Sequence, residues 1–225
     1  MNKKIVIDKV KKYLEKNFKN ESTGHDYWHF LRVWKIAIYI AKKEGGDMFV
    51  IELGALLHDV ADWKFHGGNH QTGIDKAKKL LRDFKVDNNI IDHICHIINN
   101  ISFKGADVKN DMKTKEGKIV QDADRLEAIG AIGIARVFAY GGHTGREIYN
   151  SSIKPKMHKS FRDYKNSKST SINHFYEKML LIKDRMNTKT AKKIAQRRHE
   201  FLQDYLKQFF KEWEVVRKDS PCEKR

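Results

Sequence analysis

The fold is decided by the segment that runs from Asp26 to Lys43, DYWHFLRVWKIAIYIAKK. At helical periodicity this segment is apolar almost all round, and only Lys35 and Lys42 mark an outer face, so it predicts a helix buried on most sides. His29 falls on a polar stripe along this helix, at a spacing of three residues from Asp26 and Arg32. Together with the scarcity of helix breakers and the abundance of Lys, Ile, Leu and Ala along the chain, this segment predicts an all-α fold.

The rest of the chain supports the all-α prediction. Only two prolines, Pro155 and Pro221, interrupt it, and no alternating strand pattern or internal repeat is present. We expect one domain over residues 1–225 with a flexible tail from about residue 218, and a loop or lid over 143–170. The expected helices cover residues 3–18, 26–43, 47–58, 71–84, 88–100, 115–140, 171–186 and 189–216.

Composition limits the function classes. The 225 residues carry a formal net charge of +16, which indicates an anionic partner but does not identify it. No run approaches the ~20 apolar residues that span a bilayer, and the charged N-terminus has no signal-peptide core. Two cysteines form no disulfide framework. We therefore expect a cytoplasmic protein without membrane contact.

A second pair of titratable residues follows directly after an apolar run. Residues 53–57 lead directly into His58 and Asp59, and a buried carboxylate needs a cation or several hydrogen-bond donors. Both side chains reach one ion if the helix ends here. The alternatives are an ordinary helix-terminal pair for His58-Asp59 and a satisfied core histidine for His29.

The helix expected over residues 115–140 is largely apolar but contains two aspartates. Asp122 shares a face with Ile119, Leu126 and Ile129, whereas Asp124 lies about 200° away. We therefore expect Asp122 in the core, and Asp124 either outside or paired with a base. The alternative for Asp122 is an ion pair with an arginine.

Together these helices offer two imidazoles and two carboxylates, a set that can hold one divalent cation. Mixed nitrogen and oxygen ligands favour Mn²⁺, Fe²⁺, Ni²⁺ or Mg²⁺. Four protein ligands in an octahedral shell leave two positions for water or substrate, as metal-assisted hydrolysis requires.

The order His29, His58-Asp59, Asp122 resembles the HD superfamily of metal-dependent phosphohydrolases. Three motifs carry the resemblance, at residues 25–33, 54–62 and 121–133. Segments 102–105, 141–146 and 172–180 resemble a bacterial branch of single-domain HD hydrolases. The resemblance implies an HD-domain helical bundle with additional C-terminal helices. It also implies hydrolysis of nucleoside triphosphates, plausibly deoxynucleotides, to the monophosphate and pyrophosphate.

The resemblance also implies roles for individual residues. One divalent metal ion, with Mn²⁺ favoured, would be held by His29, His58, Asp59 and Asp122. Asp62 matches an acidic position that some HD hydrolases use as an acid or base, although a salt bridge explains it equally well. The expected phosphate-binding cations are Lys64, Arg146 and Lys178.

Other interpretations stay open at this point. The substrate could be a nucleoside monophosphate, a cyclic nucleotide or a guanosine alarmone. The charge allows a nucleic-acid-binding module, although no zinc-finger, RNA-recognition or basic-zipper signature supports one, and a metal-binding regulator without turnover is a third class. His93 and His96 share a helix face and serve core packing, substrate contact or a second metal. The sequence also leaves a homodimer open.

Overall fold

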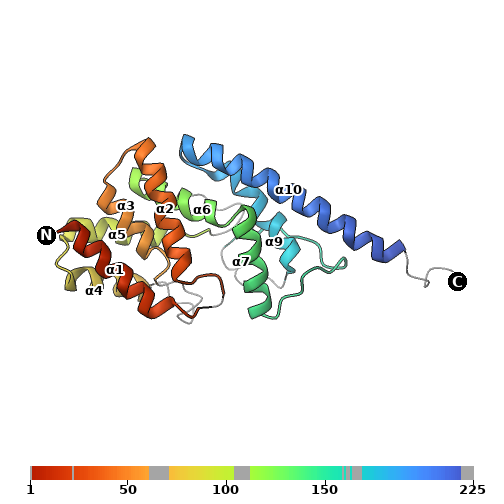
Figure 1. Ribbon diagram of the computed structural model, residues 1–225, viewed down its shortest axis with the longest axis horizontal. Coiled ribbons are helices and arrows are strands. Elements are labelled where there is room, and N and C mark those ends of the chain that lie inside the picture. Colours follow the sequence, from red (N-terminus) through yellow and green to blue (C-terminus); the bar gives the residue numbers. More distant parts are fainter. Residues whose placement is uncertain are drawn as a thin grey trace.

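The computed structural model describes residues 2–21, 23–60, 71–103, 112–158, 160, 163 and 169–218. These residues form helices, turns and irregular segments, and no β-strand is found among them. The all-α prediction is therefore confirmed. Figure 1 shows an elongated molecule, with the N-terminal helices at one end and a long C-terminal helix that reaches the other.

Three capped helices open the chain. They are α1 (Lys3–Phe18), α2 (Tyr27–Glu44) and α3 (Met48–Leu57). The side chains of Asn2, Asp26 and Asp47 accept hydrogen bonds from backbone N–H groups in the first turns of these helices, which satisfies donors that a helix start leaves unpaired. Helix α2 packs against α3 and α6 more extensively than other described pairs pack, as expected for a rod apolar on most sides.

The middle of the chain adds α4 (Gln71–Asp83), α5 (Asn88–Asn100) and α6 (Lys115–Glu127). Helices α4 and α5 pack against each other, and α5 also packs on α3. Buried side chains of all these elements belong to one hydrophobic cluster that extends from Val6 to Leu206. Helix α6 thus lies beside both α2 and α3, so the three polar motifs come from neighbouring helices.

The prediction of one long helix over 115–140 is wrong. The structure ends α6 at Glu127 and begins α7 (Gly130–His143) after a break. At the break Ile129 is extended and Gly130 has φ of +79°, a left-handed conformation that favours glycine. A Cβ atom on Gly130 would also lie 3.1 Å from the side chain of Arg198. Periodicity alone missed the break because the apolar pattern continues through it.

The C-terminal part contains α9 (Ser171–Glu177), the 3-10 turns η2 (Met179–Leu181) and η3 (Lys183–Arg185), and α10 (Lys189–Lys218). The continuous helix expected over 171–186 is therefore wrong, because Lys178 has non-helical dihedral angles (φ −141°, ψ −58°). The described residues 144–158 are turns and irregular structure, in line with the expected loop. Among the described residues, no helix combines the length and apolarity that a membrane crossing needs.

Candidate metal centre

The first turn of α2 positions His29. Asp26 caps the helix, and its carboxylate accepts a hydrogen bond of 2.8 Å from the backbone N–H of His29. His29 is fully buried, on the side of α2 that faces α3 and α6. The polar stripe predicted on this helix therefore does point a histidine into the interior.

His58 and Asp59 follow the end of α3. The helix stops at Leu57, His58 is its C-terminal cap, and Asp59 lies in a turn. His58 keeps helical dihedral angles, and the turn then tightens, since the backbone N–H of Val60 donates to the Leu57 carbonyl oxygen at 3.3 Å. The Nδ1 atom of His58 lies 2.8 Å from the carbonyl oxygen of Ala55, which fixes the orientation of the ring.

Side chains from three helical segments meet at this point. The Nε2 atoms of His29 and His58 are 3.1 Å apart, and Asp59 Oδ2 lies 3.4 Å from each of them. His29, His58 and Asp59 offer ligand atoms that all lie within 4.8 Å of one another. A second carboxylate reaches the group from α6, because Asp124 Oδ1 is 3.6 Å from His58 Nε2.

The donor set fits a divalent cation. His58 Nδ1 faces a carbonyl oxygen and His29 Nδ1 faces the Glu127 carboxylate at 3.1 Å, so both Nδ1 atoms are the ones that carry hydrogen. The Nε2 atoms then present lone pairs to each other and to Asp59 Oδ2, and His58 Nε2 also meets Asp124 Oδ1. Such a convergence of acceptors is repulsive unless a cation or a proton lies between them. Two imidazoles and two carboxylates suit Mn²⁺, Fe²⁺, Ni²⁺ or Mg²⁺.

The pKa values report the same excess of negative charge. Burial opposes a charged His58, yet the carboxylates of Asp59 and Asp124 raise its pKa well above the usual value. Burial also opposes the ionised form of Asp124, but its contact with His58 lowers its pKa to about 2. The pKa of Asp59 is likewise held well below its usual range, against burial, by the two histidines. A proton on His58 thus balances the carboxylates, and a metal ion can replace that proton.

Asp122, the fourth ligand that the resemblance implied, does not join this group. Its Oδ1 accepts hydrogen bonds from the backbone and side-chain nitrogens of Asn187, at 2.8 and 2.9 Å. Its Oδ2 accepts from the backbone N–H and the hydroxyl of Thr188, at 2.7 and 2.8 Å. Asp122 is buried as expected, but on the side of α6 that faces the start of α10. The expectation that Asp124 pairs with a base describes what the structure shows, with His58 as the partner.

Glu127 is a site residue that sequence reasoning missed. It is buried, and besides His29 it contacts Arg32 Nε at 2.6 Å and Arg136 Nη1. Burial raises the pKa of this carboxyl, but His29 and the two arginines outweigh it and lower the pKa. A carboxylate on the outer nitrogen of a ligand histidine orients the ring and fixes its tautomer. The position of Glu127 in the sequence, five residues after Asp122, does not indicate that it orients His29. Only the tertiary contact shows this role.

The remaining predicted site residues lie apart from the group or cannot be placed. Asp62 and Lys64 fall within 61–70, outside the described residues. The backbone N–H of Arg146 donates to Gly141 just after α7, and Lys178 Nζ lies 5.5 Å from the centre of the Phe103 ring. Among the contacts of the described residues, none joins Arg146 or Lys178 to the four converging acceptors.

Comparison with known proteins identifies the family. The family model of the HD domain matches residues 27–129, which include the whole histidine and aspartate group. The chain is also 34% identical to the uncharacterized protein YpgQ of Bacillus subtilis, over 91% of this chain and 92% of YpgQ. The chain belongs to the HD domain family.

Solved structures agree with this HD-family assignment. A Lactobacillus plantarum protein is 35% identical with a TM-score of 0.83, covering 96% of this chain and all of that one. A Bacillus thuringiensis protein named as an HD-superfamily hydrolase is 42% identical with a TM-score of 0.71, over 95% and 99% of the two chains. YpgQ in complex with ADP is 34% identical with a TM-score of 0.71, over 92% and 97%. The chain is therefore a metal-dependent phosphohydrolase of the HD family.

Proposed function

We propose that this HD-family phosphohydrolase cleaves nucleoside triphosphates, deoxynucleotides included, to the monophosphate and pyrophosphate. We further propose that His29, His58, Asp59 and Asp124 hold one divalent cation, with Mn²⁺ favoured. The observation that carries the ligand set is the mutual approach of His29, His58 and Asp59, with Asp124 reaching His58 from α6. The outer imidazole nitrogens face the Ala55 carbonyl and the Glu127 carboxylate instead. We place the reaction in the cytoplasm.

The chemistry follows from this arrangement. A bound divalent cation polarises a phosphoryl oxygen and lowers the pKa of coordinated water. In the reaction a water oxygen bonds to the α-phosphorus, the bond from that phosphorus to the bridging oxygen breaks, and pyrophosphate leaves. Glu127 keeps hydrogen on the outer nitrogen of His29, so the inner nitrogen stays available as a ligand.

The proton of the attacking water needs an acceptor. We propose Asp62 for this role on the basis of the resemblance, because it follows the His58-Asp59 pair by three residues. A carboxylate is chemically suited to take a proton from an activated water.

The phosphates of a nucleotide need cations to hold them. We retain Lys64, Arg146 and Lys178 as proposals, and the contacts of Lys178 add Arg185 to them. The Arg185 guanidinium lies 4.8 Å from the same Phe103 ring that Lys178 approaches. Arg125, the residue after Asp124, donates a hydrogen bond to the Arg185 carbonyl oxygen. This bond ties the Lys178 and Arg185 segment to α6 beside a proposed ligand.

The nucleotide part of the proposal has independent support. YpgQ, which aligns with this chain over almost its full length, has been crystallised with ADP. A relative with a bound adenine nucleotide supports a nucleotide substrate here, and the basic net charge of +16 favours anionic ligands in general.

Pyrophosphate release tests the proposal. The purified chain should release pyrophosphate from deoxynucleoside triphosphates with Mn²⁺, and Asp59→Ala and Asp124→Ala should each abolish the release. Asp92→Ala is the matched control, because Asp92 is exposed and contacts only Lys78 among the described ion pairs. A panel with nucleoside monophosphates, cyclic nucleotides and guanosine alarmones compares the other substrates.

The possible outcomes distinguish an error in the proposed substrate from an error in the proposed metal ligands. Preferred turnover of another phosphoester would overturn the triphosphate assignment but keep the metal centre. Unchanged turnover in well-folded Asp59→Ala and Asp124→Ala proteins would overturn the ligand set itself.

A further inference from the structure

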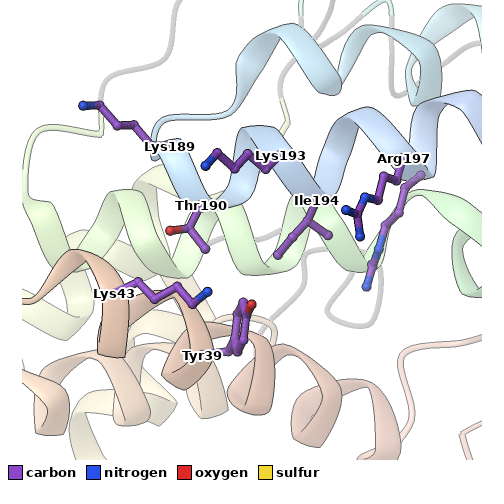
Figure 2. A pocket seen from close by; sticks show the side chains of 8 residues that line it. Tyr39, Lys43, Lys189, Thr190, Lys193, Ile194 and Arg197 are labelled. Atoms are coloured by element: carbon purple, nitrogen blue, oxygen red, sulfur yellow. The ribbon is translucent and has the colours of Figure 1, made fainter.

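A basic groove lies between the second half of α2 and the start of α10 (Figure 2). Its volume is about 480 Å³, which is within the range of small-molecule sites. Tyr39 and Lys43 form the α2 wall, and Figure 2 shows them opposite Thr190, Ile194 and Arg197 of α10. The complete lining consists of Tyr39, Lys43, Lys189, Thr190, Lys193, Ile194, Arg197 and Arg198.

The lining carries more positive charge than the nearby carboxylates balance, since Glu44 acts on Lys189 and Glu127 acts on Arg198. Five of the eight lining side chains are cationic and none is acidic. Within the part of the chain that the structure describes, Lys43, Lys189, Lys193 and Arg197 have no carboxylate partner at ion-pair distance. Lys78, Lys183 and Lys207 elsewhere do have one. Like charges gathered without counterions favour an anionic occupant.

A carboxylate at one end of the groove is hydrogen-bonded to Thr190. Glu44 Oε1 accepts hydrogen bonds from the backbone N–H and the hydroxyl of Thr190, at 2.8 and 2.6 Å. This contact joins the last residue of α2 to the first turn of α10 and so fixes one end of the groove. At the other end, Arg198 donates to the carbonyl oxygen of Leu126, which holds this guanidinium in place.

The size of the charged row indicates a compact ligand. Lys189, Lys193 and Arg197 are four residues apart on one face of α10, which spans about 12 Å at 1.5 Å per residue. The same face then continues with Glu200 and Asp204, at three and seven residues after Arg197. A long nucleic-acid strand along α10 would therefore meet negative charge, whereas a short phosphate chain would not.

Apolar surface completes the groove. The Tyr39 side chain is 48% exposed, and Lys43 Nζ lies 4.7 Å from the centre of its ring. Ile194 faces it from α10 (Figure 2). An aromatic ring beside cations suits a nucleoside base attached to phosphates, because bases stack on such rings.

We propose that this groove binds a compact polyphosphate anion, either a nucleoside polyphosphate or a free phosphate chain, separately from the metal centre. Tyr39 lies about 15 Å from His29 along α2, so the groove is a second site. The proposal is independent of which substrate the metal centre cleaves.

Calorimetric titration of the full chain in EDTA tests the groove, with inorganic tripolyphosphate and ATP as probes. Lys193→Glu/Arg197→Glu should weaken tripolyphosphate binding at least ten-fold. Lys192→Glu/Lys211→Glu is the matched control, because it makes the same change in net charge on exposed α10 positions outside the lining, and it should weaken binding less than two-fold. If charge reversal impairs folding, Lys193→Ala/Arg197→Ala should still weaken binding several-fold. Amide resonances of Thr190 and Ile194 should shift on binding.

Two further measurements show where the ligand binds and which kind of polyphosphate it is. Binding that survives in Asp59→Ala supports a separate groove, and tighter binding of ATP than of tripolyphosphate identifies a nucleoside polyphosphate as the source. Equal weakening in both charge-reversed variants would overturn the proposal, since it would reflect net charge alone. Loss of binding in Asp59→Ala, or tighter binding of a single-stranded oligonucleotide than of both compact probes, would overturn it as well.

Discussion

Asp122 and Asp124 stand two residues apart on α6 and face opposite environments. The carboxylate of Asp122 meets four hydrogen-bond donors from Asn187 and Thr188. The carboxylate of Asp124 meets His58, whose inner nitrogen is itself an acceptor unless it is protonated. A buried carboxylate with all its donors present stabilises a fold, whereas one that faces further acceptors needs a cation. The comparison teaches that the groups opposite a side chain, and not its burial, decide whether it can be a ligand.

Removal of Asp124 should produce the largest effect. Asp124→Ala should lower Mn²⁺ affinity by more than the roughly 10–100-fold typical of an outer-shell partner, because a ligand itself is lost. Its free energy of unfolding without metal should fall by less than in Asp122→Ala, because loss of the stabilising contact with His58 is partly offset by relief of the repulsion from Asp59. Calorimetric Mn²⁺ titration and urea denaturation measure the two effects. Mn²⁺ affinity equal to that of the unaltered chain would remove Asp124 from the ligand set.

Removal of Asp122 should give the opposite result. Asp122→Ala leaves the donors of Asn187 and Thr188 without their acceptor, and should lower the free energy of unfolding by about 3 kcal/mol. The Mn²⁺ affinity of the folded protein should stay within a few-fold of the unaltered chain. Urea denaturation with far-ultraviolet circular dichroism checks the stability, and Thr188→Ala should lose a smaller part of it. A stable Asp122→Ala protein that no longer binds Mn²⁺ would reverse the two roles.

Glu127 shares features of both aspartates, because it is satisfied by arginines and also contacts a proposed ligand. Glu127→Gln should cost about 10–100-fold in Mn²⁺ affinity, since an amide holds the His29 tautomer less firmly. The ¹⁵N shifts of the His29 ring should show a mixture of tautomers, which a purely structural role would not produce. Glu116→Gln is the matched control, as Glu116 contacts the Asp47 backbone and His93 but no proposed ligand. An unchanged His29 tautomer in Glu127→Gln would contradict the positioning role.

Glu44 repeats the Asp122 arrangement at lower burial, with Thr190 in the place of Thr188. Glu44→Ala should lower the free energy of unfolding by about 1 kcal/mol, as the loss of a helix cap does. The hydrogen bonds from Thr190 lower the pKa of Glu44. Its contribution is therefore fully present above the unfolded pKa of about 4.3, and is lost as the pH falls through the folded pKa.

Urea denaturation at several pH values checks the Glu44 contribution. The difference between the unaltered chain and Glu44→Ala should shrink as the pH falls below about 4. Glu200→Ala serves as the control, because Glu200 contacts only a neighbouring side chain of the same helix. A difference that stays constant at low pH would show that the ionised form of Glu44 contributes nothing.

The helical fold and three of the four proposed metal ligands, His29, His58 and Asp59, could be predicted from the sequence alone. Helix periodicity and the capping residues Asp26 and Asp47 are local signals, so the starts of α2 and α3 lie within one residue of their predicted positions. His58 and Asp59 were identifiable because an apolar helix that ends in two titratable residues brings them together within one turn.

Only the tertiary structure decided between Asp122 and Asp124. Helical spacing states which way each carboxylate points, and Asp122 is indeed buried. Helical spacing does not show that residues 187 and 188, more than sixty positions later, supply donors to Asp122. Nor does it show that His58 lies on the side of Asp124. The break at Gly130 and the contact of Glu127 with His29 likewise could not be predicted from the sequence. Each depends on groups distant in the chain, and a pattern of local spacings contains no information about them.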